Sequence, residues 1–179
     1  MKMRRFEALF LVILSLFSTT SCKKASPIYQ DALPAAELAE EARDELDLTD
    51  FRTASNDWLA DYATLPEGLS DYEICFSSDG SNLDEFGIYH VSEGQIAATE
   101  AALRTYLSES LRKNREFYDS YIPEQTQKLE KAEVRVFGNY VCYAILDEQD
   151  KSIFFGAIQT FVFMLLTTVF ISGKLPEEE

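Results

Sequence analysis

The chain has little of what catalytic and metal sites are usually made from. Its 179 residues contain a single histidine, His90, together with three cysteines, seven glycines and one tryptophan. No second histidine or cysteine stands near His90 at the spacing of a zinc site. No HExxH, CxxC or GxSxG motif and no glycine-rich phosphate loop occurs. The sequence therefore predicts neither catalytic residues nor a metal or other cofactor, and it places His90 at the edge of a sheet.

Basic residues are also scarce. Lysine and arginine number 16 against 31 aspartates and glutamates, which gives a formal net charge of -15 at pH 7. A surface of this charge repels phosphate groups, so nucleic acid is excluded as a partner. Hydrophobic residues make up 46% of the chain and aromatic residues 13%, which is enough for a packed core.

The first residues read as an export signal. A basic start at Lys2, Arg4 and Arg5 precedes an uncharged run over 8–17, which is too short to span a bilayer as a helix. Small residues then lead to Cys22 in a pattern that resembles the lipobox of bacterial lipoproteins, although threonine stands where leucine is usual. The resemblance implies cleavage before Cys22 and attachment of a diacylglyceryl group to its thiol. The alternatives are a secretory signal with an incidental Cys22 and an uncleaved membrane helix.

Cleavage at that point divides the chain into segments of different composition. We assign a signal peptide to 1–21, a lipidated tether to 22–33, an exported domain to 34–152, a hydrophobic helix to 153–172 and an acidic tail to 173–179. Acylation of Cys22 would leave Cys75 and Cys142, an even number that permits a disulfide. Alternation over 72–77 directs the large apolar side chains to one face and Cys75 to the other. The pairing of the two cysteines stays open.

The exported part combines helical and strand patterns. Apolar side chains recur at helical spacing over 34–47 and over 96–118, where a serine cap at Ser92 predicts the start of a long helix, and residues 56–62 could add one or two helical turns. Alternating patterns predict two hairpins, with strands over 71–77, 85–91, 133–137 and 140–146, and a linking turn or short helix covers 123–129. The order strand, strand, helix therefore occurs twice. We predict an α+β domain in which an antiparallel sheet carries helices on one face, with an N-terminal helix and a hydrophobic C-terminal helix.

Short motifs in this region follow one another in a characteristic order. They are Tyr62, 65–69, Asp71-Tyr72, Asp84-Glu85, 121–124, 137–141 and Ala144-Ile145. Together they resemble a bacterial lipoprotein family known as domain of unknown function 4358, over about residues 35 to 155. The resemblance implies an exported, lipid-anchored α+β domain, and it supplies no activity and no functional residue.

The segment 153–172 contains 20 residues without a charge. This length meets the criterion for a helix that spans a membrane. The alternative is a final domain helix that packs deeply on the sheet and carries a hydrophobic extension.

Two acidic clusters are candidate binding sites. The turn residues Asp79, Ser81, Asn82, Asp84 and Glu85 offer oxygen ligands for calcium, but their spacing misses the D-x-[DN]-x-[DN]-G pattern and favours a polar hairpin tip. The acids over 37–45 are most simply the solvent-facing side of a helix, although a cationic partner could use them.

The main hypothesis is a non-catalytic cell-envelope protein that is held on the extracytoplasmic side of a bacterial membrane by acylated Cys22. If the helix over 153–172 spans the membrane, it is a second anchor in addition to the lipid. Such a module would bind or assemble another envelope protein or polymer. The alternative function is a hydrolase or modifying enzyme acting on cell-wall or exported polymers, which would require convergent carboxylates with perturbed pKa values in a cleft.

Overall fold

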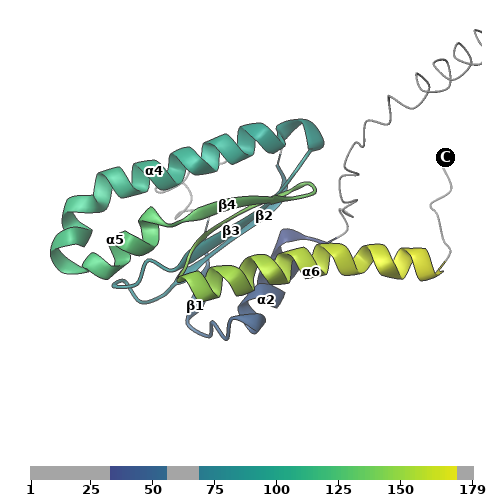
Figure 1. The fold of residues 1–179 in the computed structure, drawn as a ribbon, viewed down its shortest axis with the longest axis horizontal. Coiled ribbons are helices and arrows are strands. Elements are labelled where there is room, and N and C mark those ends of the chain that lie inside the picture. The colour runs from purple at the N-terminus through teal and green to yellow at the C-terminus, as the bar shows by residue number, and fades with distance from the viewer. Residues whose placement is uncertain (1–32, 56–68, 173–179) are drawn as a thin grey trace, which may run out of the picture.

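The computed structural model describes residues 33–55 and 69–172. Within them an antiparallel sheet is accompanied by helices, which confirms the α+β class (Figure 1). The strands are β1 (Phe51–Thr53), β2 (Leu69–Ser77), β3 (Glu85–Val91), β4 (Glu133–Phe137) and β5 (Tyr140–Ile145). The helices are α2 (Ala35–Glu45), a 3-10 turn η2 (Glu93–Gln95), α4 (Ile96–Tyr121), α5 (Pro123–Glu130) and α6 (Glu148–Ser172).

The sheet has the strand order β1-β2-β3-β5-β4, and all neighbours run antiparallel. The two predicted hairpins, β2–β3 and β4–β5, meet through β3 and β5. Each hairpin is followed by a long helix, so the repeated order strand, strand, helix is confirmed. Gly138 adopts a positive φ of 61° in the turn between β4 and β5, a conformation that glycine reaches without steric cost.

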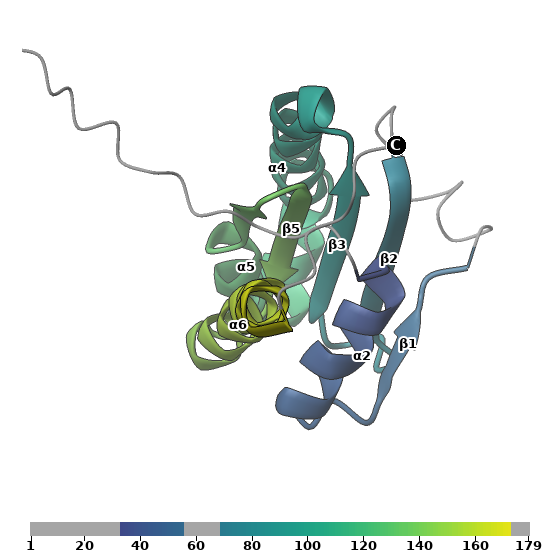
Figure 2. The same ribbon diagram turned by 90° about the vertical axis from the view of Figure 1, so that its right-hand side faces the viewer.

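Helices cover both faces of the sheet, whereas the sequence analysis placed them on one. Phe86 and Ile88 of β3 pack in a core with α2 and α6, while Tyr89 and Val91 pack in a second core with α4 and α5. Figure 2 shows α2 and α6 on one side of the strands and α4 and α5 on the other. The reason is that β3 and β5 carry large apolar side chains in both phases of the alternation, so neither face can be left to water.

The helix α6 begins as part of the domain core. The ammonium of buried Lys151 donates hydrogen bonds to the Lys131 carbonyl oxygen at 2.5 Å and to Glu148 at 2.9 Å, which holds the first turn in place. Four apolar side chains of the following turns are buried against α2 and the sheet: Phe154, Phe155, Ile158 and Val162. Residues 153–162 therefore agree with the second prediction for this segment, a final domain helix that packs on the sheet. Among the residues whose side chains the structure describes, which in α6 end at 162, no helix is long and apolar enough to cross a membrane.

Cys75 and Cys142 are both buried, and their thiols are free. The predicted alternation is confirmed, because Ile74 packs on the α4 side of the sheet and Cys75 packs on the α2 side. Cys22 and the segments 56–62 and 173–179 lie outside the described residues. Lipid attachment at Cys22 therefore stays a prediction.

The described chain begins at one end of the sheet. The Tyr140 hydroxyl donates to the Leu33 carbonyl oxygen at 2.6 Å, and the backbone N–H of Ala35 donates to Asp71 Oδ2 at 3.1 Å. His90 stacks on Tyr140 with ring centroids 4.6 Å apart, and its Nδ1 lies 3.4 Å from Asp71 Oδ1. His90 thus lies at the end of a central strand rather than on an edge strand. Together these contacts fix the start of α2.

Candidate functional site

A groove opens at the other end of the sheet, beside the turn that joins β2 to β3. Its volume is about 410 Å³, which is within the range of ligand sites. On its floor, Arg52, Phe76, Glu85 and Ile145 occupy facing register positions on β1, β2, β3 and β5. Facing residues of adjacent strands share one face of the sheet, so the four side chains form a row under the groove. The Arg52 guanidinium lies over the Phe76 ring at 5.6 Å.

One side of α4 forms the wall of the groove. Tyr106, Ser110, Asn114 and Tyr118 all line it, and they follow one another at intervals of four residues. This spacing brings side chains to the same side of a helix, one turn above the other. The wall therefore has an aromatic ring at each end, with a hydroxyl and an amide between them.

The rim of the groove is the β2–β3 turn, which is held by local hydrogen bonds. Asp79 Oδ1 accepts from the Ser81 backbone N–H at 2.9 Å and from its hydroxyl at 2.8 Å. These bonds lower the pKa of Asp79, the backbone bond contributing more. The Leu83 N–H donates to Gln125 Oε1 of α5 at 3.0 Å. The rim is therefore fixed both within the turn and from α5.

An ion pair attaches the same turn to α5. Lys128 Nζ contacts Asp84 Oδ1, and the two side chains are only 9% and 13% exposed. Asp147 lies farther away, at 3.7 Å from Lys128 Nζ. The prediction of a polar hairpin tip is confirmed: Asp79 bonds to Ser81 within the turn, and Asp84 pairs with Lys128 of α5. In the part of the chain that the structure describes, no group of three acidic, histidine or cysteine side chains is placed to hold a metal ion.

Glu85 is the central polar group of the groove. Its Oε1 accepts hydrogen bonds from the Tyr143 hydroxyl at 2.5 Å and from the Tyr106 hydroxyl at 2.8 Å. Burial raises the pKa of Glu85, and the bonds from the two tyrosines oppose this rise. Burial and the nearby Glu85 carboxylate in turn raise the pKa of both tyrosines. The cluster therefore favours a carboxyl group that keeps its proton to higher pH than an ordinary glutamate.

A second cavity of about 600 Å³ lies between α2 and β2. Its lining includes Arg43, Glu73 and Cys75, and burial together with the Glu73 charge raises the pKa of Cys75 to about 11. The Arg43 Nη2 donates to the Phe51 carbonyl oxygen at 3.2 Å. The acids of α2 at its mouth are exposed, as predicted for the solvent-facing side of that helix. The groove is the better candidate site, because it combines a perturbed carboxyl with aromatic and uncharged polar walls.

Sequence reasoning recognised the polar turn but missed the role of Glu85. Its apolar neighbours in the sheet, Phe76 and Ile145, come from other strands, and Ile145 is 60 positions away. The helical spacing of the apolar side chains of α4 was visible in the sequence, but nothing in the pattern singled out Ser110 and Asn114. Cys22, the predicted lipid-attachment residue, is not among the described residues.

The described residues define an α+β domain with a groove at one end of its sheet. Residues 60–146 match the model of a family described as Domain of unknown function (DUF4358). The match includes the two hairpins, α4 and α5, and therefore most of the groove, while α2, β1 and α6 lie outside it. The curated proteins and the solved structures contain no significant match to the chain. The resemblance found in the sequence is thus confirmed at the level of this domain.

Proposed function

We propose that the chain is a lipoprotein anchored through Cys22 on the extracytoplasmic side of a bacterial cell membrane. Its domain is a non-catalytic module that binds or organises another envelope component. The groove between the β2–β3 turn and α4 is the recognition site of this module.

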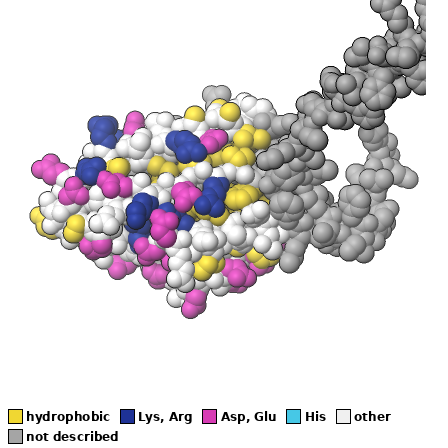
Figure 3. Space-filling model, viewed as in Figure 1, with side chains coloured by type: hydrophobic (Ala, Val, Ile, Leu, Met, Phe, Trp, Pro, Cys, Tyr) yellow, Lys and Arg dark blue, Asp and Glu magenta, His cyan; other side chains and the backbone are white. Residues whose placement is uncertain are grey.

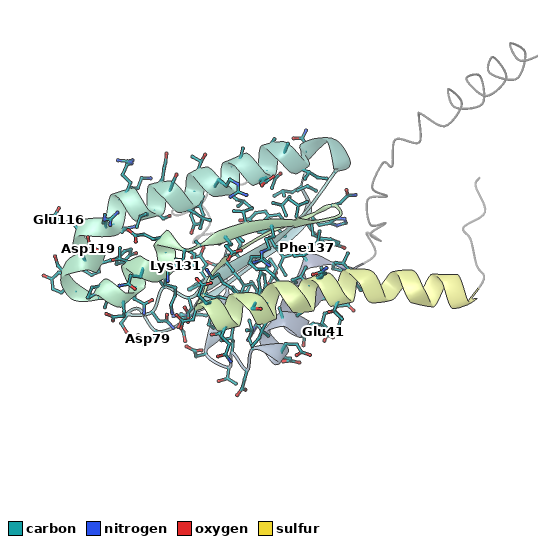
Figure 4. The ribbon with its side chains drawn as sticks, in the orientation of Figure 1. Glu41, Asp79, Glu116, Asp119, Lys131 and Phe137 are labelled. Carbon is teal, nitrogen blue, oxygen red and sulfur yellow. The ribbon has the colours of Figure 1, made fainter. Side chains whose placement is uncertain are left out.

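The position of the groove relative to the start of the domain carries the proposal. Asp71 and Tyr140 hold residues 33–35 at one end of the sheet, whereas Glu85 and Ile145 lie at the other end. Tyr140 and Ile145 belong to the same strand and are separated by about 17 Å along it. Figure 4 places Asp79 at the same end of the molecule as Glu116 and Asp119, and Phe137 toward the opposite end. A tether that ends at residue 33 would therefore present the groove away from the membrane.

The bonding of the groove acids supports recognition over catalysis. Asp84 is paired with Lys128, and Glu85 Oε1 already accepts two tyrosine hydroxyls. Acids committed in this way stabilise the shape of the groove and are poorly placed to exchange protons with a substrate. They suit a site whose geometry is fixed before the ligand arrives.

The raised pKa of Glu85 favours one second candidate, a hydrolase or modifying enzyme acting on cell-wall or exported polymers. In that case Glu85 would act as a general acid. Glu85→Gln would then abolish turnover of a polymer substrate while leaving its binding in place. A binding module would show no turnover in either form.

The anchor is tested by following processing in cells. Globomycin should block maturation of the chain, and Cys22→Ser should remove the lipid from the mature product, as measured by mass spectrometry. Ser21→Ala is the matched control, because it keeps a small residue before Cys22 and should be processed normally. A mature wild-type product with an unmodified Cys22 thiol would contradict the anchor.

The recognition site is tested by photo-crosslinking in intact cells. A crosslinking residue at Asn114 lies in the groove wall, and one at the exposed Arg112 on the same helix serves as the control. We expect a discrete adduct from position 114 that position 112 does not give. Identical adducts from both positions would show that the groove is not the recognition site.

A further inference from the structure

The wall of the groove offers two kinds of contact. Tyr106 and Tyr118 contribute aromatic rings at the two ends of the α4 stripe, and Ser110 and Asn114 contribute a hydroxyl and an amide between them. The stripe is about 18 Å long from the first tyrosine to the last. Aromatic faces cover apolar C–H surfaces, while hydroxyls and amides both donate and accept hydrogen bonds. A ligand with apolar faces and polar edges would use both.

The charges of the groove nearly cancel. Lys128 neutralises Asp84 beside the rim, and the lining carries one further charge of each sign, Arg52 on the floor and Asp79 on the rim. Burial favours the neutral form of Glu85. The groove is therefore close to neutral in a chain whose net charge is -15. Figure 3 shows acidic and basic side chains interspersed over one face of the molecule.

This balance restricts the ligand. An anion would be repelled by the overall negative charge of the chain, and the groove lining has no excess of positive charge to offset that repulsion. A cation would find Asp84 already paired with Lys128 and Glu85 Oε1 already accepting hydrogen bonds from two tyrosine hydroxyls. A neutral ligand avoids both of these costs, and it can exchange hydrogen bonds with Ser110 and Asn114.

We propose that the groove binds a neutral, hydroxyl-rich ligand, namely the sugar units of an oligosaccharide or polysaccharide. This inference rests on the proposed function, because it takes the groove as the recognition site of the module. Tyr118, which is half-buried, would stack on a sugar ring, and Asn114 would bond to its hydroxyls.

The proposal is tested with the full chain purified in detergent. Short neutral oligosaccharides of glucose, mannose and N-acetylglucosamine are titrated and followed by calorimetry, with inorganic phosphate and spermidine as charged probes. Tyr118→Ala and Asn114→Ala are compared with Tyr121→Ala, a matched control on the same helix, because Tyr121 is 74% exposed and does not line the groove. Thermal unfolding of each variant establishes that it is folded.

We expect at least one neutral oligosaccharide to bind, with the affinity lowered about tenfold or more by Tyr118→Ala and unchanged by Tyr121→Ala. Asn114 is exposed, so Asn114→Ala should fold, and it tests the groove even if Tyr118→Ala does not fold. Equal affinities in the groove variants and the control would overturn the site. Binding of only phosphate or spermidine, or of no sugar, would overturn the ligand class. If the sugar titrations fail but position 114 still gives an adduct in cells, the groove is a recognition site and only the sugar ligand is wrong.

Discussion

Tyr143 lies directly opposite Gly87 in the pairing of β5 with β3, and its ring fills the space where a side chain at position 87 would stand. A Cβ atom built on Gly87 would come within 2.3 Å of Tyr143 Cε1. The same tyrosine donates its hydroxyl hydrogen to Glu85. Because Gly87 has no side chain, the Tyr143 ring can lie where its hydroxyl reaches Glu85, the central carboxyl of the groove.

Gly87→Ala should destabilise the domain by about 1 to 3 kcal/mol, because the new methyl group must displace the Tyr143 ring in a packed core. The measurement is the free energy of unfolding in urea. Gly156→Ala is the matched control, since a Cβ there meets nothing within 4 Å and alanine is favoured in a helix such as α6. Equal stabilities of the two variants would show that Tyr143 does not need this space.

Replacing Glu85 by glutamine should change the pH dependence of stability. An unfolded glutamate titrates near about pH 4.3, and burial raises the pKa of Glu85 in the folded chain. Between those two values the folded state binds more protons than the unfolded state, so the free energy of unfolding falls as pH rises. Glutamine does not titrate, and its amide oxygen can still accept from the tyrosines.

The stability of the wild type relative to Glu85→Gln should therefore decrease as pH rises through this window and level off above the folded pKa. Urea unfolding at a series of pH values measures it. A relative stability that increases with pH would mean that folding lowers the pKa of Glu85 instead.

The Lys128–Asp84 pair should show strong coupling. Lys128→Met leaves a mostly buried carboxylate without its partner, which should cost about 3 kcal/mol. The double variant with Asp84→Asn should recover most of that loss. A double-mutant cycle of unfolding free energies measures the coupling. Additive single changes would show that the pair contributes nothing specific to the rim of the groove.

The two buried cysteines should resist alkylation in the folded chain. Burial is the main cause that raises the pKa of Cys75 to about 11, and burial raises that of Cys142 further. Only the thiolate reacts rapidly, so iodoacetamide at about pH 8 should modify neither residue until urea is added. Mass spectrometry of the Cys22→Ser variant measures the modification without interference from the third thiol. Rapid labelling of the native chain would contradict the burial of these residues.

The sequence predicted the elements of the fold better than their packing. The period of two located β3 at its observed bounds, and the helical spacing located α2 and α4. The three-residue strand β1 was missed because so short a segment has no period to detect. The second helical layer was missed because β5 is buried along its whole length, and continuous burial does not indicate which helix covers which face.

The groove was beyond the reach of sequence patterns for a related reason. The turn residues near Glu85 are local and were recognised together. The row formed by Arg52, Phe76 and Ile145 depends on strand order and register, which the sequence does not reveal by itself. The protonation behaviour of Glu85 follows from that assembly and not from its neighbours along the chain.

The attachment of Leu33 and Ala35 to Tyr140 and Asp71 has a mechanical consequence. If the chain is tethered at its start and a bound polymer pulls on the groove, the force runs along the strands. Hydrogen bonds between antiparallel strands lie across that direction, so many of them resist sliding at once instead of opening in succession. With the force along the strands, the sheet would carry tension between membrane and ligand without losing its hydrogen bonds one after another.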